Sequence, residues 1–391
     1  MNQAIKRRRA LAALLGSSLG WAAPSSGAQT AKVAAAPANL AQDSWPAWRA
    51  FRTQFMSEGG RIIDTGSARS QTFSEGQAYA LFFALVANDR GAFETLLRWT
   101  EDNLCGGDLT ARLPAWLWGR RDDNTWGVID SNAASDADLW IAYALGEAGR
   151  LWNERRYAAL SNLISARVLR EGTADLPGLG LSLLPGPMGF VPAPGRWKLN
   201  PSYLPMQLMR WLARHGDGSA WQQIAESSIK IILGASPKGF APDWILFDAT
   251  QGFLPDLAGE EKGQGAYNAI RVYLWAGTLD PDSPDRKVLL KALAPMARHV
   301  RDTGQPPESI DILTGQATRP GPSGFSAAML PFLQAQGDRP TLQRQLDRLE
   351  AKPLRPDAYY EQVLSLFALG WRDGFYKFAP DGHLQPRWKR V

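Results

Sequence analysis

The residues best suited to chemistry in this sequence lie in the stretch 72–80, which reads TFSEGQAYA. Its one carboxylate, Glu75, precedes a strongly apolar run at 81–86. Ser74 and Gln77 have the S-x-x-Q spacing of a capping box, which predicts a helix that begins here. Glu75 is therefore expected at a helix mouth, beside a glycine that leaves room for something to approach. A first-turn Glu can also simply complement the helix dipole, so spacing alone leaves both a structural and a catalytic role open.

Two further polar side chains, Asp136 and Asn268, also stand where a loop enters a predicted helix. In a ring of helical hairpins, such entry points can all face one end of the molecule. Acidic residues favour helix N-termini in any protein, and this explains each position singly. It does not explain why these positions accompany Trp-rich loops, where Trp116, Trp118 and Trp126 cluster.

Cysteine and histidine are too scarce to carry the chemistry. The single cysteine, Cys105, cannot form an intrachain disulfide. The three histidines, His215, His299 and His383, give little support for a catalytic thiol, a Ser-His-Asp triad or a His-based metal site. The sequence therefore predicts chemistry by carboxylates and aromatic residues, with no metal and no cofactor.

Charge and composition narrow the class of ligand. The formal net charge of +5 includes four basic residues at positions 6–9, so the rest of the chain is close to neutral. No basic stripe or recognition motif indicates nucleic-acid binding. Sixteen tryptophans are an excess that suits a polysaccharide groove, because flat sugar faces stack on exposed indole rings, although most tryptophans in proteins are core residues.

The N-terminus has the features of a secretory signal peptide at residues 1–28. Basic residues 6–9 precede an apolar segment, and Ser26-Gly27-Ala28 resembles a cleavage site. The apolar run is too short to predict a stable membrane span, although an uncleaved anchor is the alternative interpretation. Residues 29–42 are predicted to be a disordered leader, and 43–391 a single domain in the periplasm or outside the cell.

Helical periodicity dominates after this leader. Apolar residues recur at i, i+3 and i+4 in eleven segments, at 76–88, 92–103, 134–152, 157–171, 203–214, 221–232, 266–276, 285–301, 326–336, 341–350 and 359–370. Alternation typical of strands is sparse, and Gly/Pro-rich connectors separate the segments, the longest at 177–195. The pattern predicts an all-α toroid of helical hairpins with functional loops.

Many stretches of the chain, taken together and in this order, resemble family 8 of the glycoside hydrolases. They are residues 45–48 (WPAW), 61–64 (RIID), 74–79 (SEGQAY), 113–119 (LPAWLWG), 130–138 (DSNAASDAD), 200–205 (NPSYLP), 237–240 (PKGF), 242–244 (PDW), 269–273 (AIRVY) and 324–328 (GFSAA). Within the family, the chain resembles the periplasmic endoglucanases that accompany bacterial cellulose synthase. The resemblance implies an (α/α)6 barrel whose long loops form a substrate groove.

The resemblance also implies roles for individual residues. Glu75 matches the general acid, and Asp136 the aspartate that holds the sugar at the cleavage point. Tyr203 and Arg271 match residues that line the catalytic centre. A general acid must carry its proton at the working pH, which burial against aromatic rings or a nearby carboxylate favours, and Asp136 is the expected neighbour. Asp138, two residues further along the predicted helix, is expected to be structural.

The chain departs from the family pattern at position 268. Similar sequences have Tyr-Asp-Ala-Ile-Arg, whose Asp is the water-activating base, whereas this chain has Asn268. An amide can position a water molecule but cannot take its proton at neutral pH. Another carboxylate would have to serve as base, and the candidates are Glu260, Glu261, Asp243, Asp248 and Asp256.

The expected function is hydrolysis of β-1,4-glucan (cellulose) with inversion by a secreted endoglucanase linked to cellulose synthesis, with the cellulose synthase complex as a further partner. Trp116, Trp118, Trp126, Tyr203 and Arg271 are the expected substrate-binding residues. Two alternatives stay open: an impaired cellulose-binding pseudoenzyme of the same fold, and a chitosanase or xylanase of the same family that uses another base.

Overall fold

The computed structural model describes residues 45–67 and 69–389. In this part of the chain, helices alternate between an inner and an outer position. The inner helices are α2 (Ser74–Val86), α4 (Ser135–Trp152), α6 (Met206–His215), α8 (Ile270–Thr278), α10 (Ser323–Ala335) and α12 (Tyr359–Arg372). The outer helices are α1 (Pro46–Phe55), α3 (Arg90–Leu104), α5 (Arg155–Glu171), α7 (Gly218–Ala235), α9 (Arg286–Thr303) and α11 (Arg339–Ala351).

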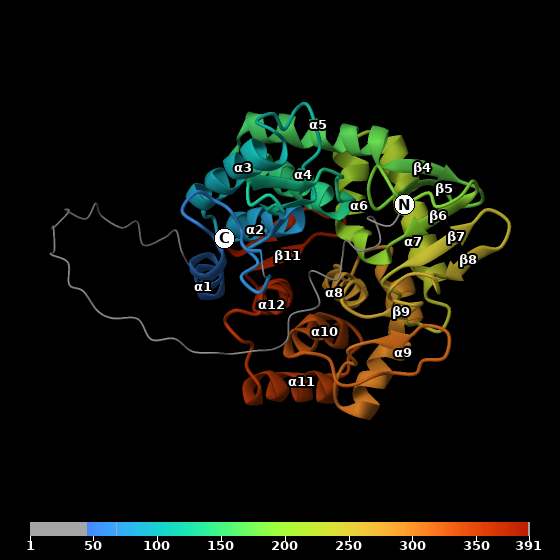
Figure 1. Ribbon diagram of the computed structural model, residues 1–391. Coiled ribbons are helices and arrows are strands. Elements are labelled where there is room, and N and C mark those ends of the chain that lie inside the picture. Colours follow the sequence, from blue (N-terminus) through green and yellow to red (C-terminus); the bar gives the residue numbers. More distant parts are fainter. Residues whose placement is uncertain (1–44, 68, 390–391) are drawn as a thin grey trace.

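The inner helices pack side by side into a closed ring (Figure 1). The ring closes where α12 meets α2, because the Phe367 ring stacks on Phe82 with a centroid distance of 5.5 Å and meets Phe83 edge-on at 4.7 Å. Each outer helix lies against its inner neighbour, and α1 completes the outer layer beside α12. The protein is thus an (α/α)6 barrel, which confirms the expected fold.

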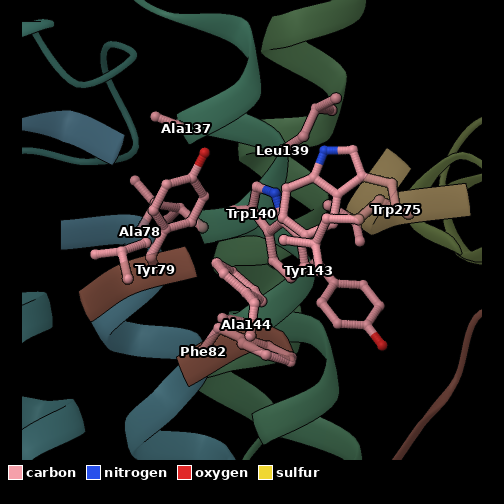
Figure 2. Close-up of a cluster of buried hydrophobic side chains, with 14 of the residues drawn as sticks. Ala78, Tyr79, Phe82, Ala137, Leu139, Trp140, Tyr143, Ala144 and Trp275 are labelled. Carbon is pink, nitrogen blue, oxygen red and sulfur yellow. The ribbon is translucent and has the colours of Figure 1, made fainter. Parts of the chain in front are cut away.

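Composition explains which helices are inner. Every residue of α2 is buried, and after Glu75 this helix contains no charged side chain. The outer helix α3 instead buries a stripe with i, i+3, i+4 spacing that includes Phe93, Leu96 and Leu97. Figure 2 shows the resulting core, where side chains from α2 and α4 meet Trp275 of α8.

Short antiparallel strands occupy the connections between helices. They are β1 (Thr72–Phe73), β2 (Leu117–Arg120) and β3 (Trp126–Asp130) in one sheet; β4 (Thr173–Leu176) with β5 (Gly180–Leu183); β6 (Arg196–Leu199), β7 (Ile245–Asp248) and β8 (Gly252–Pro255) in a second sheet; β9 (Gln264–Gly265) with β10 (Ile310–Asp311); and β11 (Tyr376–Phe378) with β12 (Leu384–Pro386). Two 3₁₀ turns, η2 (Pro201–Tyr203) and η3 (Arg387–Lys389), complete the described elements.

The eleven predicted helices all exist, with ends that differ by a few residues. The periodicity missed α1, and it placed Tyr203 in a helix where the structure has η2. The predicted capping box is wrong. Ser74 is already helical, and the Gln77 side chain instead accepts from Ile62 N–H (2.6 Å) and donates to Gly60 C=O (3.0 Å). Gln77 therefore ties α2 to the preceding loop.

The predicted signal peptide and leader lie outside the described residues. Among the described residues, no helix combines the length and apolar character needed to cross a bilayer.

Candidate active site

The N-terminal ends of several inner helices meet at one end of the barrel, and the predicted site residues lie there. Glu75 is in the first turn of α2 and Asp136 in the first turn of α4, and both are buried. Arg271 lies in the first turn of α8 and approaches Asp136 with Nη2 at 3.7 Å from Oδ2. In Figure 2, the Tyr79 hydroxyl points toward Ala137 at the start of α4, the same end of the barrel.

Glu75 is held by two donors from its immediate surroundings. The Trp116 indole N–H donates to Oε1 at 3.3 Å, and the Ser74 hydroxyl lies 3.4 Å from Oε2. Trp116 can reach Glu75 because β1 pairs with β2, placing Phe73 beside Leu117. The neighbouring Gly76 leaves room for protein rather than ligand, because a Cβ there would lie 2.4 Å from the Tyr359 hydroxyl. The glycine thus lets α12 pack against the start of α2.

Arg271 is the central cation of the site. Its guanidinium donates to the hydroxyls of Tyr79 (3.3 Å) and Ser202 (2.8 Å) and to Asn268 Oδ1 (2.9 Å). Burial alone would lower the pKa of Arg271, but Tyr79, Tyr360 and Asp136 outweigh it and raise that pKa above its usual range. Arg271 is therefore a permanent positive charge opposite the buried carboxyl groups. Positions 268 and 271 are thus in direct contact through their side chains.

Tyr203 ends η2 and is fully buried, with its ring 5.7 Å from the Arg271 guanidinium carbon. A second ring, that of Trp244, lies 6.3 Å from Tyr203 between centroids. Tyr203 therefore lies beside the site, as expected, and packs against its cation.

Asp138 belongs to the same buried group of carboxyls. It is 1% exposed, and its Oδ1 has no hydrogen-bond partner among the described residues. Burial, and secondarily the charges of Asp136 and Glu75, raise the pKa of Asp138 well above its usual range. Asp138 is thus a buried acid whose surroundings oppose its charged form.

The three loop tryptophans differ in exposure. Trp116 is 4% exposed and part of the core, Trp118 is half-buried, and Trp126 is 51% exposed. Trp118 and Trp126 stack across the β2–β3 hairpin with a centroid distance of 5.4 Å. The Arg61 guanidinium covers both rings, at 4.4 and 5.0 Å, and Trp99 of α3 meets Trp118 edge-on. Trp116 donates to Glu75, whereas Trp126 offers the most exposed ring of the three.

The candidate replacement bases are spread over the loop that leads to α8. Asp248 pairs with Arg196, and Asp256 pairs with Lys198 at 2.5 Å. Glu260 and Glu261 are half-buried in the following turn. Asp248 and Asp256 are thus engaged with cations of β6.

Asp243 contacts the site directly, through the backbone of Asn268. Its Oδ1 accepts from the backbone N–H groups of Ala266 (2.8 Å), Asn268 (3.0 Å) and Ala269 (2.8 Å). Burial raises the pKa of Asp243 to about 6, while the Ala266 and Ala269 amides act in the opposite direction. Sequence reasoning treated Asp243 only as one of five candidates, although it belongs to the PDW stretch at 242–244.

The single thiol and the potential metal ligands are the remaining groups with chemical potential. Cys105 is buried, and burial raises the pKa of its thiol, which opposes thiolate formation. Within the described part of the chain, no group of three or more His, Cys, Asp or Glu residues has the arrangement of a metal site. The site can therefore offer a buried carboxyl at a helix mouth, a carboxylate–guanidinium pair and an amide.

Comparisons with known proteins identify the family. The model for glycosyl hydrolases family 8 matches residues 22–374. The endoglucanase of Salmonella typhi is 47% identical over 345 residues, covering 88% of this chain and 91% of the relative, and that of Escherichia coli K12 is 44% identical over 363 residues, covering 93% and 96%.

A solved structure agrees with these relatives. The endo-1,4-D-glucanase of Vibrio fischeri ES114 is 44% identical, with a TM-score of 0.81 over 88% of this chain and 99% of its own. The family match covers most of the sequence. It agrees with the fold of inner and outer helices and with the carboxyl at the mouth of α2. The chain belongs to glycosyl hydrolases family 8.

Proposed function

We propose that this protein is an endo-β-1,4-glucanase that hydrolyses cellulose chains with inversion. The observation that carries the proposal is the buried Glu75 carboxyl, held by Trp116 next to the Arg271–Asp136 pair. Its relatives at 44–47% identity are endoglucanases, which supports β-1,4-glucan as the substrate. Glycosidic cleavage needs an acid at the leaving oxygen, and Glu75 is the residue proposed for that step.

In the proposed reaction, Glu75 gives its proton to the glycosidic oxygen as the bond to the anomeric carbon breaks. A water molecule attacks that carbon from the opposite face, and its proton passes to a base or to solvent. Asp136 and Arg271 hold the sugar at the cleavage point. Their mutual 3.7 Å approach keeps both charges compensated while they are buried.

Asn268 is proposed to position the attacking water without taking its proton. Its Oδ1 is already an acceptor for Arg271, at 2.9 Å, and an amide has no basic site at neutral pH. General-base assistance is typically worth roughly 10²–10⁴-fold in rate. The wild-type enzyme is therefore expected to be slow. This same observation favours the second candidate function, a cellulose-binding pseudoenzyme.

Substrate contacts are proposed at Trp118, Trp126 and Tyr203 in addition to Arg271, while the buried Trp116 is proposed to hold Glu75. The protein is further proposed to act in the periplasm or outside the cell, on cellulose chains during their export by cellulose synthase. The signal-like residues 1–28 and the resemblance to synthase-associated endoglucanases support this assignment.

The assay for the proposed function compares two readouts on carboxymethylcellulose. Internal cuts lower the viscosity early, while few reducing ends have appeared. Cuts at chain ends instead release many reducing ends while the viscosity stays high. Xylan and chitosan serve as parallel substrates. Faster release from xylan or chitosan than from the glucan would assign a different substrate, and tight cellulose binding without release would favour the pseudoenzyme.

The different exposure of Trp126 and Trp116 predicts a loss of binding for one variant and a loss of stability for the other. Trp126→Ala should weaken cellohexaose binding about tenfold, or ~1.4 kcal/mol, with a stability change within about 0.5 kcal/mol, since the ring is half-exposed. Trp116→Ala should cost about 3–5 kcal/mol of stability because that ring is in the core. Calorimetric binding and thermal melting check both. Unchanged binding by Trp126→Ala would remove Trp126 from the substrate-binding residues.

A further inference from the structure

Helix α8 begins without a side-chain cap of its own. The residue before its first turn is Ala269, which has no polar side chain. The N–H groups at a helix start have no partner within the helix and need acceptors from elsewhere. Here the acceptors are carbonyls of the preceding turn, since Ile270 N–H donates to Ala266 C=O and Arg271 N–H to Asn268 C=O. That turn is held in its place by Asp243, whose Oδ1 accepts from the N–H groups of Ala266, Asn268 and Ala269.

The Asp243 carboxylate comes from a distant segment that is itself fixed. Asp243 lies 25 residues before Asn268 in the chain and is only 3% exposed. Its own N–H donates to Gln264 C=O at 2.9 Å. The two segments pack so closely that a Cβ on Gly265 would lie 1.9 Å from Ala241 O. Backbone N–H groups of a turn that converge on one carboxylate oxygen form an anion-binding concavity.

Two residues of the proposed site depend on this backbone. Asn268 is one of the residues whose N–H is bound by Asp243, and Arg271 is one turn later. Arg271 in turn contacts Asn268 Oδ1, Ser202 Oγ and Asp136. A shift of the 266–269 backbone would therefore displace the amide and the guanidinium together.

We propose that Asp243 is a positioning residue, whose carboxylate fixes the turn at 266–269 that leads into α8, so that Asn268 and Arg271 meet the reacting sugar. The expected effect of Asp243 on turnover rests on the proposed function. Its expected effect on glucan binding, which acts through Arg271, does not. A displacement of about 1 Å can cost up to about 100-fold in rate. A residue that acts only through two others can therefore have a large kinetic effect.

The test compares Asp243→Ala and Asp243→Asn with Asp89→Ala. Asn keeps an oxygen that can accept the three amides, whereas Ala removes it. Asp89 is the matched control, because its side chain caps α3 through Ala92 N–H at 3.0 Å, on an outer helix. We measure kcat and KM for reducing-end release from carboxymethylcellulose, cellohexaose binding by calorimetry, and Tm.

Asp243→Ala is expected to lower kcat by about 10–100-fold and to weaken cellohexaose binding. Asp243→Asn should restore both to within about threefold of wild type, and Asp89→Ala should lower Tm without changing either. If Asp243→Ala does not fold, Asp243→Ser, whose hydroxyl is too short to bind all three amides, gives the same comparison.

Three results would overturn the proposal. One is an Asp243→Ala variant with the kcat and binding of Asp89→Ala. Another is an Asp243→Asn variant as impaired as Asp243→Ala, which would mean that the charge itself is needed, as for a proton acceptor. The third is an Asp243→Ala effect on kcat that adds fully to that of Asn268→Ala in a double-mutant cycle, since acting through Asn268 requires coupling. If the wild type binds glucan but does not cut it, the proposed function fails, and the binding comparison still tests Asp243.

Discussion

Replacing Glu75 with Gln is expected to lower turnover on unactivated glucan by roughly 10²–10⁴-fold while the fold and cello-oligosaccharide binding persist. Gln has the same shape, and it can keep the contact to Trp116 that Oε1 now makes. It has no acidic proton for the glycosidic oxygen, so the leaving group would depart as an alkoxide. Reducing-end release from carboxymethylcellulose measures the loss.

A substrate with an activated leaving group separates acid catalysis from general damage. An aryl cellotrioside whose phenol leaves without protonation should be cleaved by Glu75→Gln at close to the wild-type rate. Glu94→Gln is the control, because Glu94 lies on outer helix α3 and binds Tyr157. Unchanged turnover of Glu75→Gln on unactivated glucan would remove Glu75 from the mechanism.

Replacing Asn268 with Asp is expected to raise kcat by one or more orders of magnitude, within the roughly 10²–10⁴-fold range of a general base. The change is nearly isosteric and supplies a proton acceptor where the proposed water is held. The structure accommodates the new charge, because Asn268 Oδ1 already faces Arg271 at 2.9 Å and the side chain is partly exposed. Binding should change less than turnover.

The control for this variant is Asn162→Asp, an equivalent change on the exposed face of α5. A fast wild type that Asn268→Asp leaves unchanged would contradict the prediction and assign the base to another carboxylate. Scanning Glu260, Glu261, Asp243, Asp248 and Asp256 would then locate it. If neither form cuts but both bind cellulose, the protein is a pseudoenzyme.

Periodicity predicted the helices well because the outer ones bury only one stripe and the inner ones are strongly apolar. It failed where long-range contacts decide the structure. Gln77 has capping-box spacing, yet its side chain binds Ile62 and Gly60, which no local rule indicates. The short strands, such as β2 and β3, were missed because loop pairings of two to five residues leave little alternation to detect.

The site could be predicted only in part. Glu75, Asp136 and Arg271 were predicted from motifs, and the structure brings them to one end of the barrel. The roles of Ser202 and Asp243 depend on contacts across 69 and 25 residues of sequence. Both lie in stretches that carry the family resemblance, and that was the available signal.

Tryptophan composition could not separate core from surface. Trp116 and Trp126 are ten positions apart in one loop system, yet one is buried beside Glu75 and the other is half-exposed. The difference comes from strand pairing. Trp116 directly precedes β2, which pairs with β1, whereas Trp126 is the first residue of β3.

The anomer released first from cellohexaose tests the central claim of a single displacement assisted by Glu75. Proton NMR of the fresh reaction, before mutarotation, distinguishes the two forms, and Asn268→Asp supplies a faster enzyme if the wild type is slow. Attack by water opposite the leaving group inverts the β-linkage, so the new reducing end is expected to appear as the α-anomer. Initial release of the β-anomer would contradict it, because retention requires a carboxylate that bonds to the sugar, a role given to no residue of this site.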